Sequence, residues 1–131
     1  MRKDIEIPKS EGVYIAIVLE YNPEYEFDDW NAYLINDLDT DLEMVFVVTE
    51  GYDTERRTSK MRHAMPVIPK KSYAKVELMM EDVFKLNNKF SVSYFAEGKL
   101  YDKTFTFPKN SINKNALRDI PHMDYKGVLM K

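Results

Sequence analysis

The sequence contains no cysteine, and its four glycines are widely dispersed. Without cysteine there is no disulfide framework, thiolate metal site or cysteine nucleophile, and a reducing compartment such as the cytoplasm is favoured. The glycines do not cluster into a phosphate-binding loop, and no Gly-x-Ser-x-Gly elbow occurs. The sequence therefore lacks the common motifs for nucleotide binding and for nucleophilic catalysis.

Long hydrophobic segments are also missing. The longest uninterrupted apolar run covers residues 13–19, whereas a helix needs about 20 apolar residues to cross a bilayer. The first residues, 1–8, are interrupted by charges and contain no apolar segment of the kind found in secretory signal peptides. We therefore expect a cytoplasmic protein that does not associate with membranes.

The composition predicts one β-rich domain over residues 1–131. A chain of 131 residues with 44% hydrophobic residues is long and apolar enough for a single core. Its net charge of −3 conceals a strong asymmetry. Residues 1–50 hold thirteen acids and three bases, whereas residues 51–71 hold two acids and six bases. Such separated charge favours particular partners or self-association.

Alternation of apolar and polar residues predicts strands rather than long helices. Residues 13–19 are apolar at both odd and even positions and are rich in β-branched residues, which is typical of a central strand covered on both faces. The expected strands are 13–20, 30–36, 42–50, 73–80, 89–96 and 101–107.

Within two of these strands the pattern also predicts which side chains share a face. In the strand over 42–50, one face is expected to carry four apolar residues, Leu42, Met44, Phe46 and Val48. In the strand over 73–80, Ala74, Val76 and Leu78 are expected on one face, opposite the charged pair Lys75 and Glu77.

Short helices and a final strand complete the expected fold. Residues 81–88 predict one or two helical turns, and Ser111 is placed to cap a second short helix that ends at Arg118. Residues 128–130 suit an edge strand. The predicted class is a mainly β, single-domain antiparallel sandwich with one or two short helices. The strand order is compatible with an immunoglobulin-like arrangement, and a partly open barrel is the alternative.

The acidic run over residues 37–43 places a carboxylate at every second position. A calcium-binding EF-hand loop needs glycine at its sixth position and glutamate at its twelfth, but counting from Asp37 these are Leu42 and Val48. We interpret the run as a solvated turn and predict no metal site.

Acids and aromatics alternate over residues 24–30. Tyr25, Phe27 and Trp30 in this segment are candidates for binding a basic or apolar partner, because aromatic side chains dominate interface energetics. The alternative is that they fold inward over one end of the core, which is the commoner fate of aromatics in a single domain.

The basic stretch 54–71 is the strongest candidate for ligand binding, and residues 51–71 are expected to form a loop. A phosphate or carboxylate can be held by charge-assisted hydrogen bonds from such side chains. The alternative is a solvated loop that pairs with the acidic segment 20–43 of the same chain or of a second copy in a homodimer. The candidate ligand-binding residues are Arg56, Arg57, Lys60, Arg62 and His63.

Catalysis and nucleic-acid binding have little support in the sequence. The two histidines, His63 and His122, lie in no recognisable catalytic motif, so we predict neither an enzyme nor a cofactor. Nucleic-acid-binding domains are usually basic, whereas this chain has a pI of about 5.4.

A family resemblance rests on five segments of the chain: residues 2–8, 29–36, 58–63, 86–88 and 126–129. In these segments the chain resembles a family of short bacterial proteins of uncharacterised function, some of which carry the label phenylalanyl-tRNA synthetase α subunit. A class II synthetase catalytic domain requires a much longer chain and a glycine-rich ATP-binding motif with an arginine, so that activity is not expected here. The resemblance implies a soluble protein of the bacterial cytoplasm, and it implies no site residues.

Together these observations predict a non-catalytic binding or interaction module, with a protein partner or a second copy of the chain as its target. The alternative is an RNA-associated protein of the translation machinery that uses the basic stretch 54–71.

Overall fold

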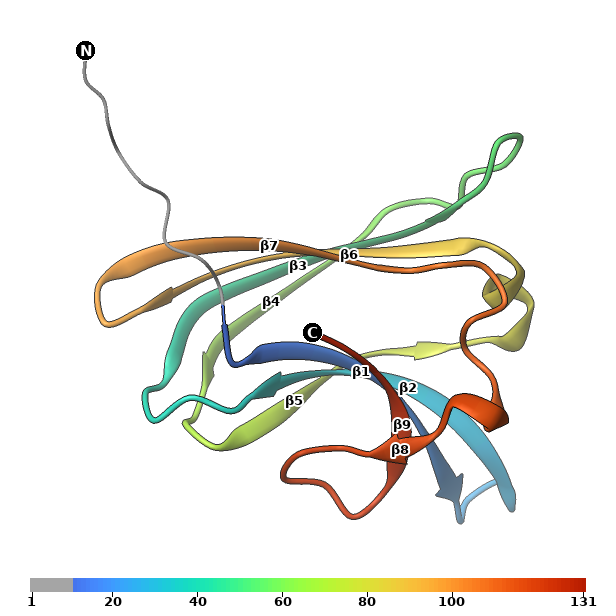
Figure 1. Ribbon diagram of the computed structural model, residues 1–131, viewed down its shortest axis with the longest axis horizontal. Coiled ribbons are helices and arrows are strands. Elements are labelled where there is room, and N and C mark those ends of the chain that lie inside the picture. Colours follow the sequence, from blue (N-terminus) through green and yellow to red (C-terminus); the bar gives the residue numbers. More distant parts are fainter. Residues whose placement is uncertain (1–10) are drawn as a thin grey trace.

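A computed structural model describes residues 11–131, which fold into two antiparallel sheets packed face to face (Figure 1). The first resemblance segment, residues 2–8, lies outside the described residues. The strands of the described chain are β1 (Val13–Asn22), β2 (Phe27–Asn36), β3 (Leu42–Tyr52), β4 (Met61–Ile68), β5 (Ser72–Met79), β6 (Asn87–Ala96), β7 (Lys99–Phe107), β8 (Arg118–Asp119) and β9 (Lys126–Met130).

The strand order confirms the predicted β-sandwich. Sheet A has the order β5-β2-β1-β9-β8, and sheet B has the order β4-β3-β6-β7. In the first seven strands, β1, β2 and β5 pair in one sheet and β3, β4, β6 and β7 in the other, which agrees with the A-B-E and C′-C-F-G arrangement of immunoglobulin-like sandwiches. As predicted, β1 is a central strand, because it pairs with β2 on one side and with β9 on the other.

The main core fills the space between the two sheets. Val13, Ile15 and Ile17 of β1 are buried there, and the hairpin β6–β7 contributes four large aromatic side chains from the opposite sheet. The outer face of β1 is also covered, because Ala16 and Val18 pack in a second cluster with Ile35 and Ile120. The aromatic residues of the hairpin are Phe90, Tyr94, Phe105 and Phe107.

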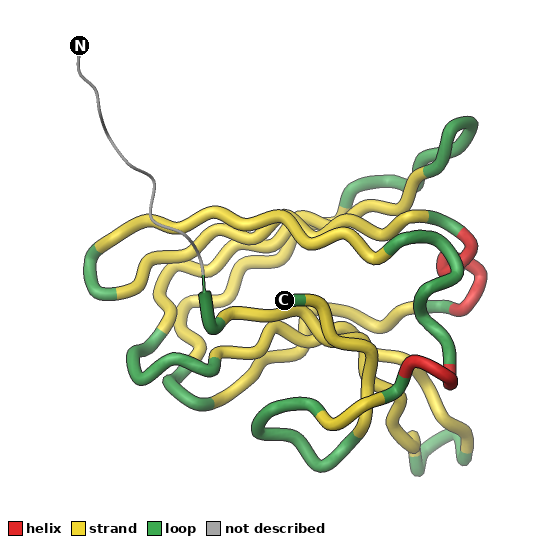
Figure 2. The backbone as a smooth tube through the Cα atoms, in the orientation of Figure 1, coloured by secondary structure: helices red, strands yellow, loops and turns green. Residues whose placement is uncertain are grey.

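Two strands were missed by the sequence analysis: β4 and the two-residue β8, whose Arg118 was expected to end a helix. The predicted loop over residues 51–71 contains β4, and β3 continues through Gly51 to Tyr52. Strand β4 is the outer strand of sheet B and is mostly exposed, so its sequence includes charged residues and Pro66 and lacks a clear apolar face. The true loop covers residues 53–60, which project from one end of the sandwich in Figure 2.

Two β-bulges overturn the predicted facing of β3 and β5. In β3, Met44 and Val45 together oppose a single position of β6, so Val45 and Val47 are buried while Met44 and Phe46 face outward. In β5, Val76 is the extra residue opposite β2. An added residue reverses the alternation beyond it. In β5 the consequence is that Glu77 and Met79 face the space between the sheets and Leu78 faces solvent.

The helical segments are shorter than predicted. The helix η1 (Glu81–Lys85) confirms the turn expected near residue 81. The second helix, η2 (Lys114–Ala116), is capped by the Asn113 side chain and not by Ser111, whose hydroxyl donates to the carbonyl oxygen of Pro108. Strand β9 lies between β1 and the two-residue β8, so the last strand is not at the edge of its sheet.

Candidate functional site

The three candidate aromatic residues lie together at one end of the sandwich, but they do not share one environment. Tyr25 lies in the β1–β2 turn and Phe27 begins β2; their rings are 6.1 Å apart, and they are 67% and 52% exposed. Trp30 is 5% exposed and packs edge-on against Phe84 of η1 at 5.4 Å. The structure thus gives Trp30 a core position and leaves Tyr25 and Phe27 at the surface.

These aromatics line a groove that also receives residues from β5 and its continuation. Leu78 and Met80 are 50% and 64% exposed and lie on its other wall. The wall exists because the bulge in β5 turns Leu78 outward and because Met80 leads into η1. Trp30 pairs with Met79 in the β2–β5 ladder, and both line the floor. The groove has a volume of about 290 Å³.

The rim of this groove is acidic. Six carboxylates lie on its lining segments or beside them in sequence, and within residues 11–131 none of the six makes an ion pair. The Asp29 carboxylate instead accepts hydrogen bonds from the amides of Asn22 and Asn31. An apolar groove with uncompensated negative charge favours a partner that is both apolar and basic. Of the six, Asp28, Asp29 and Glu81 line the groove itself, and Glu24, Glu26 and Asp82 are next to lining residues in sequence.

The candidate basic residues are dispersed, and two of them are already paired. Arg56 lies in the loop after β3 and donates to Asp53 through Nε and Nη2 at 3.1 and 2.8 Å. Arg57 pairs with Glu50 at 3.2 Å. Lys60 and Arg62 are exposed and make no ion pair with any residue that the structure describes. These side chains therefore do not converge on a single anion site.

Glu50 is a buried carboxylate held by two cations. Its side chain is 4% exposed, and its oxygens lie 3.2 Å from Arg57 Nη1 and 3.4 Å from Lys89 Nζ. Burial alone raises the pKa of Glu50, but the hydrogen bond from Lys89 and the charges of Arg57, Lys60 and Lys89 outweigh it and lower the pKa below its usual value. The pair with Arg57 thus fixes the base of the loop that begins at residue 53.

His63, the fifth candidate, contacts a residue that sequence analysis placed on the opposite face. Its Nε2 lies 2.8 Å from Oε1 of Glu77, and the same oxygen accepts a hydrogen bond from Thr49 Oγ1 at 2.7 Å. A nucleophile triad needs the histidine to contact the hydroxyl. Here the carboxylate lies between the two, and neither histidine in the described chain is hydrogen-bonded to a hydroxyl. The geometry supports positioning, not activation of a nucleophile.

Residues 37–41 of the acidic run form the turn between β2 and β3, while residues 42 and 43 begin β3. The turn was predicted, and its carboxylates contact residues of other segments. Asp37 accepts from His122 at 2.7 Å and lies 3.5 Å from Lys71, and Asp41 accepts from the Lys70 backbone. The acidic and basic segments therefore form ion pairs within the chain only through Lys71, among the described residues, whereas Arg56 and Arg57 pair with Asp53 and Glu50, which lie outside segment 20–43. No group of three or more metal-ligating acids or histidines occurs in residues 11–131.

Three residues of the site were missed from the sequence: Leu78, Met80 and Glu77. Each lies at or beyond the bulge in β5, so counting by twos from Ala74 assigns Leu78 and Glu77 to the wrong faces. A signal available in the sequence was the run of three consecutive apolar residues at 78–80, which simple alternation at the end of the expected strand 73–80 does not bury.

Comparisons with protein-family models, with curated proteins and with solved structures gave no match. The resemblance to the family of short bacterial proteins therefore stays a prediction. The helices described in the structure are too short and too polar to cross a membrane.

Proposed function

We propose that the protein is a non-catalytic binding module whose groove takes a segment of a protein partner that carries basic residues beside apolar ones. The observation that carries this proposal is the gathering of four exposed apolar side chains around one groove: Tyr25, Phe27, Leu78 and Met80.

The chemistry of the groove supports a protein ligand. Aromatic and methionine side chains are enriched in the cores of protein interfaces, and a contiguous exposed apolar patch is uncommon in a monomer without a binding role. Strand β2 also extends beyond the end of β5, since Trp30 pairs with Met79 and residues 27–29 have no β5 partner. An extended segment laid in the groove therefore meets both apolar side chains and an unpaired strand edge.

The acidic rim determines the sign of the charge that the partner must carry. Six carboxylates without ion pairs in the described chain attract a basic segment and repel an acidic one, and exposed charges act more on encounter and orientation than on affinity. The apolar contacts supply most of the affinity. Binding should therefore weaken with salt without being abolished.

Trp30 provides the test, because it is the chain's single tryptophan and lies on the groove floor. Its fluorescence is followed while the protein is titrated with a short peptide that alternates lysine with leucine. Analogues that replace lysine by glutamate, or leucine by serine, are the comparisons. Only the lysine–leucine peptide is expected to saturate the signal. Equal binding of the glutamate analogue would refute the charge argument, and equal binding of the lysine–serine analogue would refute the apolar one.

Matched variants locate the binding. Phe27→Ser is expected to lower the affinity for the lysine–leucine peptide about tenfold, a typical loss for an exposed aromatic anchor. Phe46→Ser is the control, because Phe46 is also exposed but lies on β3 in the other sheet. If both variants bind alike, the groove is not the site. Light scattering on the same samples detects a second copy of the chain as the occupant.

The second candidate function is RNA binding by the stretch 54–71, and the observation that favours it is that Lys60 and Arg62 are exposed without ion pairs in the described chain. Gel-shift titration against tRNA at two salt concentrations separates the candidates. Phosphate contacts release counterions, so RNA affinity through this stretch falls steeply with salt and is lost in a Lys60→Ser, Arg62→Ser variant.

A further inference from the structure

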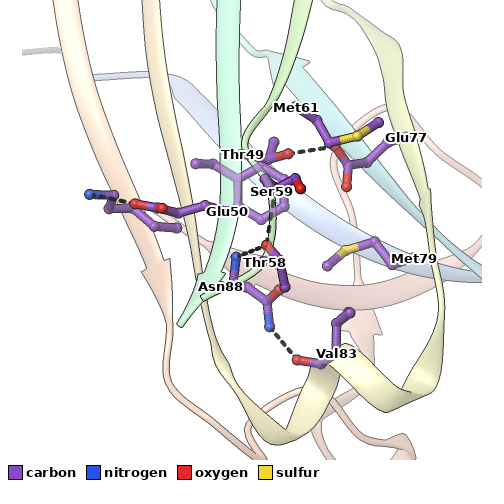
Figure 3. A pocket seen from close by; sticks show the side chains of 12 residues that line it. Thr49, Glu50, Thr58, Ser59, Met61, Glu77, Met79, Val83 and Asn88 are labelled. Carbon is purple, nitrogen blue, oxygen red and sulfur yellow. Dashed lines mark hydrogen bonds and ion pairs between the residues drawn. The ribbon is translucent and has the colours of Figure 1, made fainter. Parts of the chain in front are cut away.

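A second hollow, of about 260 Å³, lies between the end of β3, residues 58–61, β5 and η1 (Figure 3). Asn88, Lys89 and Phe90 of β6 also line it, and it shares only Met79 with the groove described above. Figure 3 shows Glu77, Met61 and Met79 on one side of this hollow, and Thr58 and Asn88 on the other. The space is large enough for several water molecules or one small organic group.

One of the two oxygens of the Glu77 carboxylate, which lines this hollow, is available to a ligand. Oε1 of Glu77 takes the contacts from Thr49 and His63, and Oε2 has no partner among residues 11–131. Glu50 also lines the hollow, but its side chain points away from it in Figure 3 and is compensated by Arg57 and Lys89. The hollow therefore presents one accessible negative charge, that of Glu77.

The hollow is also lined by Ser59 and Lys89. Lys89 Nζ lies 3.4 Å from Oε1 of Glu50, and the Ser59 hydroxyl, which can donate or accept, has no partner among the described residues. Thr58 Oγ1 donates to the carbonyl oxygen of Ser59 and accepts from the Gly51 amide. Asn88 uses its Nδ2 protons on the carbonyl oxygens of Val83 and Leu86, and its Oδ1 has no partner among the described residues. Oε2 of Glu77 and Oδ1 of Asn88 are thus acceptors without a described partner, and the Ser59 hydroxyl can accept as well, so the hollow suits a cationic donor.

The walls between these polar groups are apolar. Met61, Met79, Val83 and Phe90 line them. Methionine side chains adapt to alkyl chains because they are unbranched and polarizable. An alkyl stem can therefore lie along the walls while its charged end reaches Glu77, the arrangement that long basic side chains adopt at protein surfaces.

We propose that this hollow binds a primary alkylammonium group, with the ammonium donating to Glu77 and the alkyl stem packed between Met79 and Val83. Two sources share this chemistry: a free small amine and the lysine side chain of a polypeptide. The proposal is independent of the groove, because its ligand, its lining residues and its test differ.

The test is an NMR titration of the isotopically labelled protein with n-butylammonium, n-butanol and butyrate. Saturable shifts of the Gly51, Thr58 and Asn88 amide signals are expected with butylammonium alone. Equal shifts with butanol would show that only the apolar walls bind, and a stronger response to butyrate would show an anion site; either result overturns the proposal, as does the absence of saturation. Nα-acetyl-lysine amide, whose backbone groups are blocked and whose side-chain ammonium is free, then identifies the source. Tighter binding than butylammonium assigns a polypeptide lysine, and weaker binding assigns a free amine.

Two variants tie the binding to Glu77. Glu77→Gln removes the charge but keeps an acceptor for Thr49 and His63. It is expected to lower the affinity for butylammonium at least tenfold. Glu97→Gln is the matched control, because Glu97 is exposed in the β6–β7 turn. Met61→Lys, at an exposed lining residue, supplies a tethered ammonium and is expected to abolish binding of the free amine. Unchanged affinity in both Glu77→Gln and Met61→Lys, with folding verified by their amide spectra, overturns the assignment.

Discussion

His63 and Glu77 join the two sheets at their outer strands: Nε2 of His63 on β4 lies 2.8 Å from Oε1 of Glu77 on β5. Within residues 11–131 both strands have a backbone partner on one side only, so this contact and the Thr49 hydrogen bond hold the open side of the sandwich together. A hydrogen bond to a charged group contributes more than a neutral one when it is shielded from water, and both side chains are about four-fifths buried.

The first prediction concerns this contact. His63→Ala is expected to lower the free energy of unfolding by about 1–2 kcal/mol, because a largely buried hydrogen bond to a carboxylate is lost. Urea denaturation measures the change. Arg62→Ala, at the exposed neighbouring position of β4, is the control and is expected to stay within about 0.5 kcal/mol of wild type. Equal losses in the two variants would assign the effect to β4 itself and not to the bridge.

Local patterns in the sequence were sufficient for the hairpin β6–β7 and for β1. Phe90, Val92 and Tyr94 alternate without interruption and are all buried, and the two-residue turn at Glu97 and Gly98 has the positive φ values typical of tight hairpins. Here the neighbours of each residue in sequence also decide its environment, so the local pattern was enough to predict the strands 13–20, 89–96 and 101–107.

The site depends on features that alternation does not contain. Whether β5 bulges at Val76 depends on how it pairs with β2, which is far away in sequence, and the bulge decides that Leu78 enters the groove and Glu77 the hollow. Strand β4 likewise forms because it can pair with β3 through backbone hydrogen bonds, although the sequence of β4 is basic and contains Pro66. Long-range pairing, not composition, sets these positions.

The second prediction concerns Gly127 in β9. A Cβ placed there would lie 2.7 Å from the carbonyl oxygen of Ile17 and 3.0 Å from Cα of Val18, both in the backbone of the central strand. Because backbone atoms of a central strand cannot move aside without a large energetic cost, Gly127→Ala is expected to destabilise the fold by about 1–3 kcal/mol, as overpacking does. Thermal unfolding measures it. Gly98→Asn, in an open turn with φ of +76°, is the control and is expected to be nearly neutral; a neutral Gly127→Ala would contradict the close approach.

The third prediction concerns pH and Glu50. Its pKa is lowered in the folded state because the hydrogen bond from Lys89 and the nearby cations outweigh burial. A carboxylate with a lowered folded pKa stabilises the fold above its unfolded pKa, and this contribution is lost as pH falls through the folded value. Asp37, whose pKa is lowered chiefly by its hydrogen bond with His122, and Asp53, whose pKa Arg56 holds at about 2, act in the same direction.

Wild-type stability is therefore expected to fall as the pH drops below about 4.5, the range in which glutamates begin to protonate. Glu50→Gln is expected to be less stable by about 1–3 kcal/mol at pH 7, through loss of charged hydrogen bonds, and to lose less stability between pH 7 and pH 3. Urea titrations at both pH values measure the difference. Glu97→Gln supplies the comparison, and parallel pH dependence in wild type and Glu50→Gln would refute the assignment.

The last prediction uses the bulge in β3. Met44 has φ of +49°, a left-handed conformation that costs a residue with a Cβ about 1–2 kcal/mol. Its side chain is 72% exposed, so truncation removes little buried surface. Met44→Gly is therefore expected to raise the free energy of unfolding by up to about 1 kcal/mol, since glycine adopts this conformation without strain but loses more entropy on folding.

The control for Met44→Gly lies on the neighbouring strand. Ser93 of β6 is in the outer face of the same sheet and has no positive φ, so Ser93→Gly relieves no strain and is expected to cost about 0.5–1 kcal/mol. Urea denaturation of both variants gives opposite signs if Met44 sits in the bulge. A loss of stability in Met44→Gly equal to that in Ser93→Gly would mean that residue 44 is in regular β conformation. In that case the alternation through Leu42, Met44 and Phe46 would continue unbroken, and the facing of β3 read from the sequence would be restored.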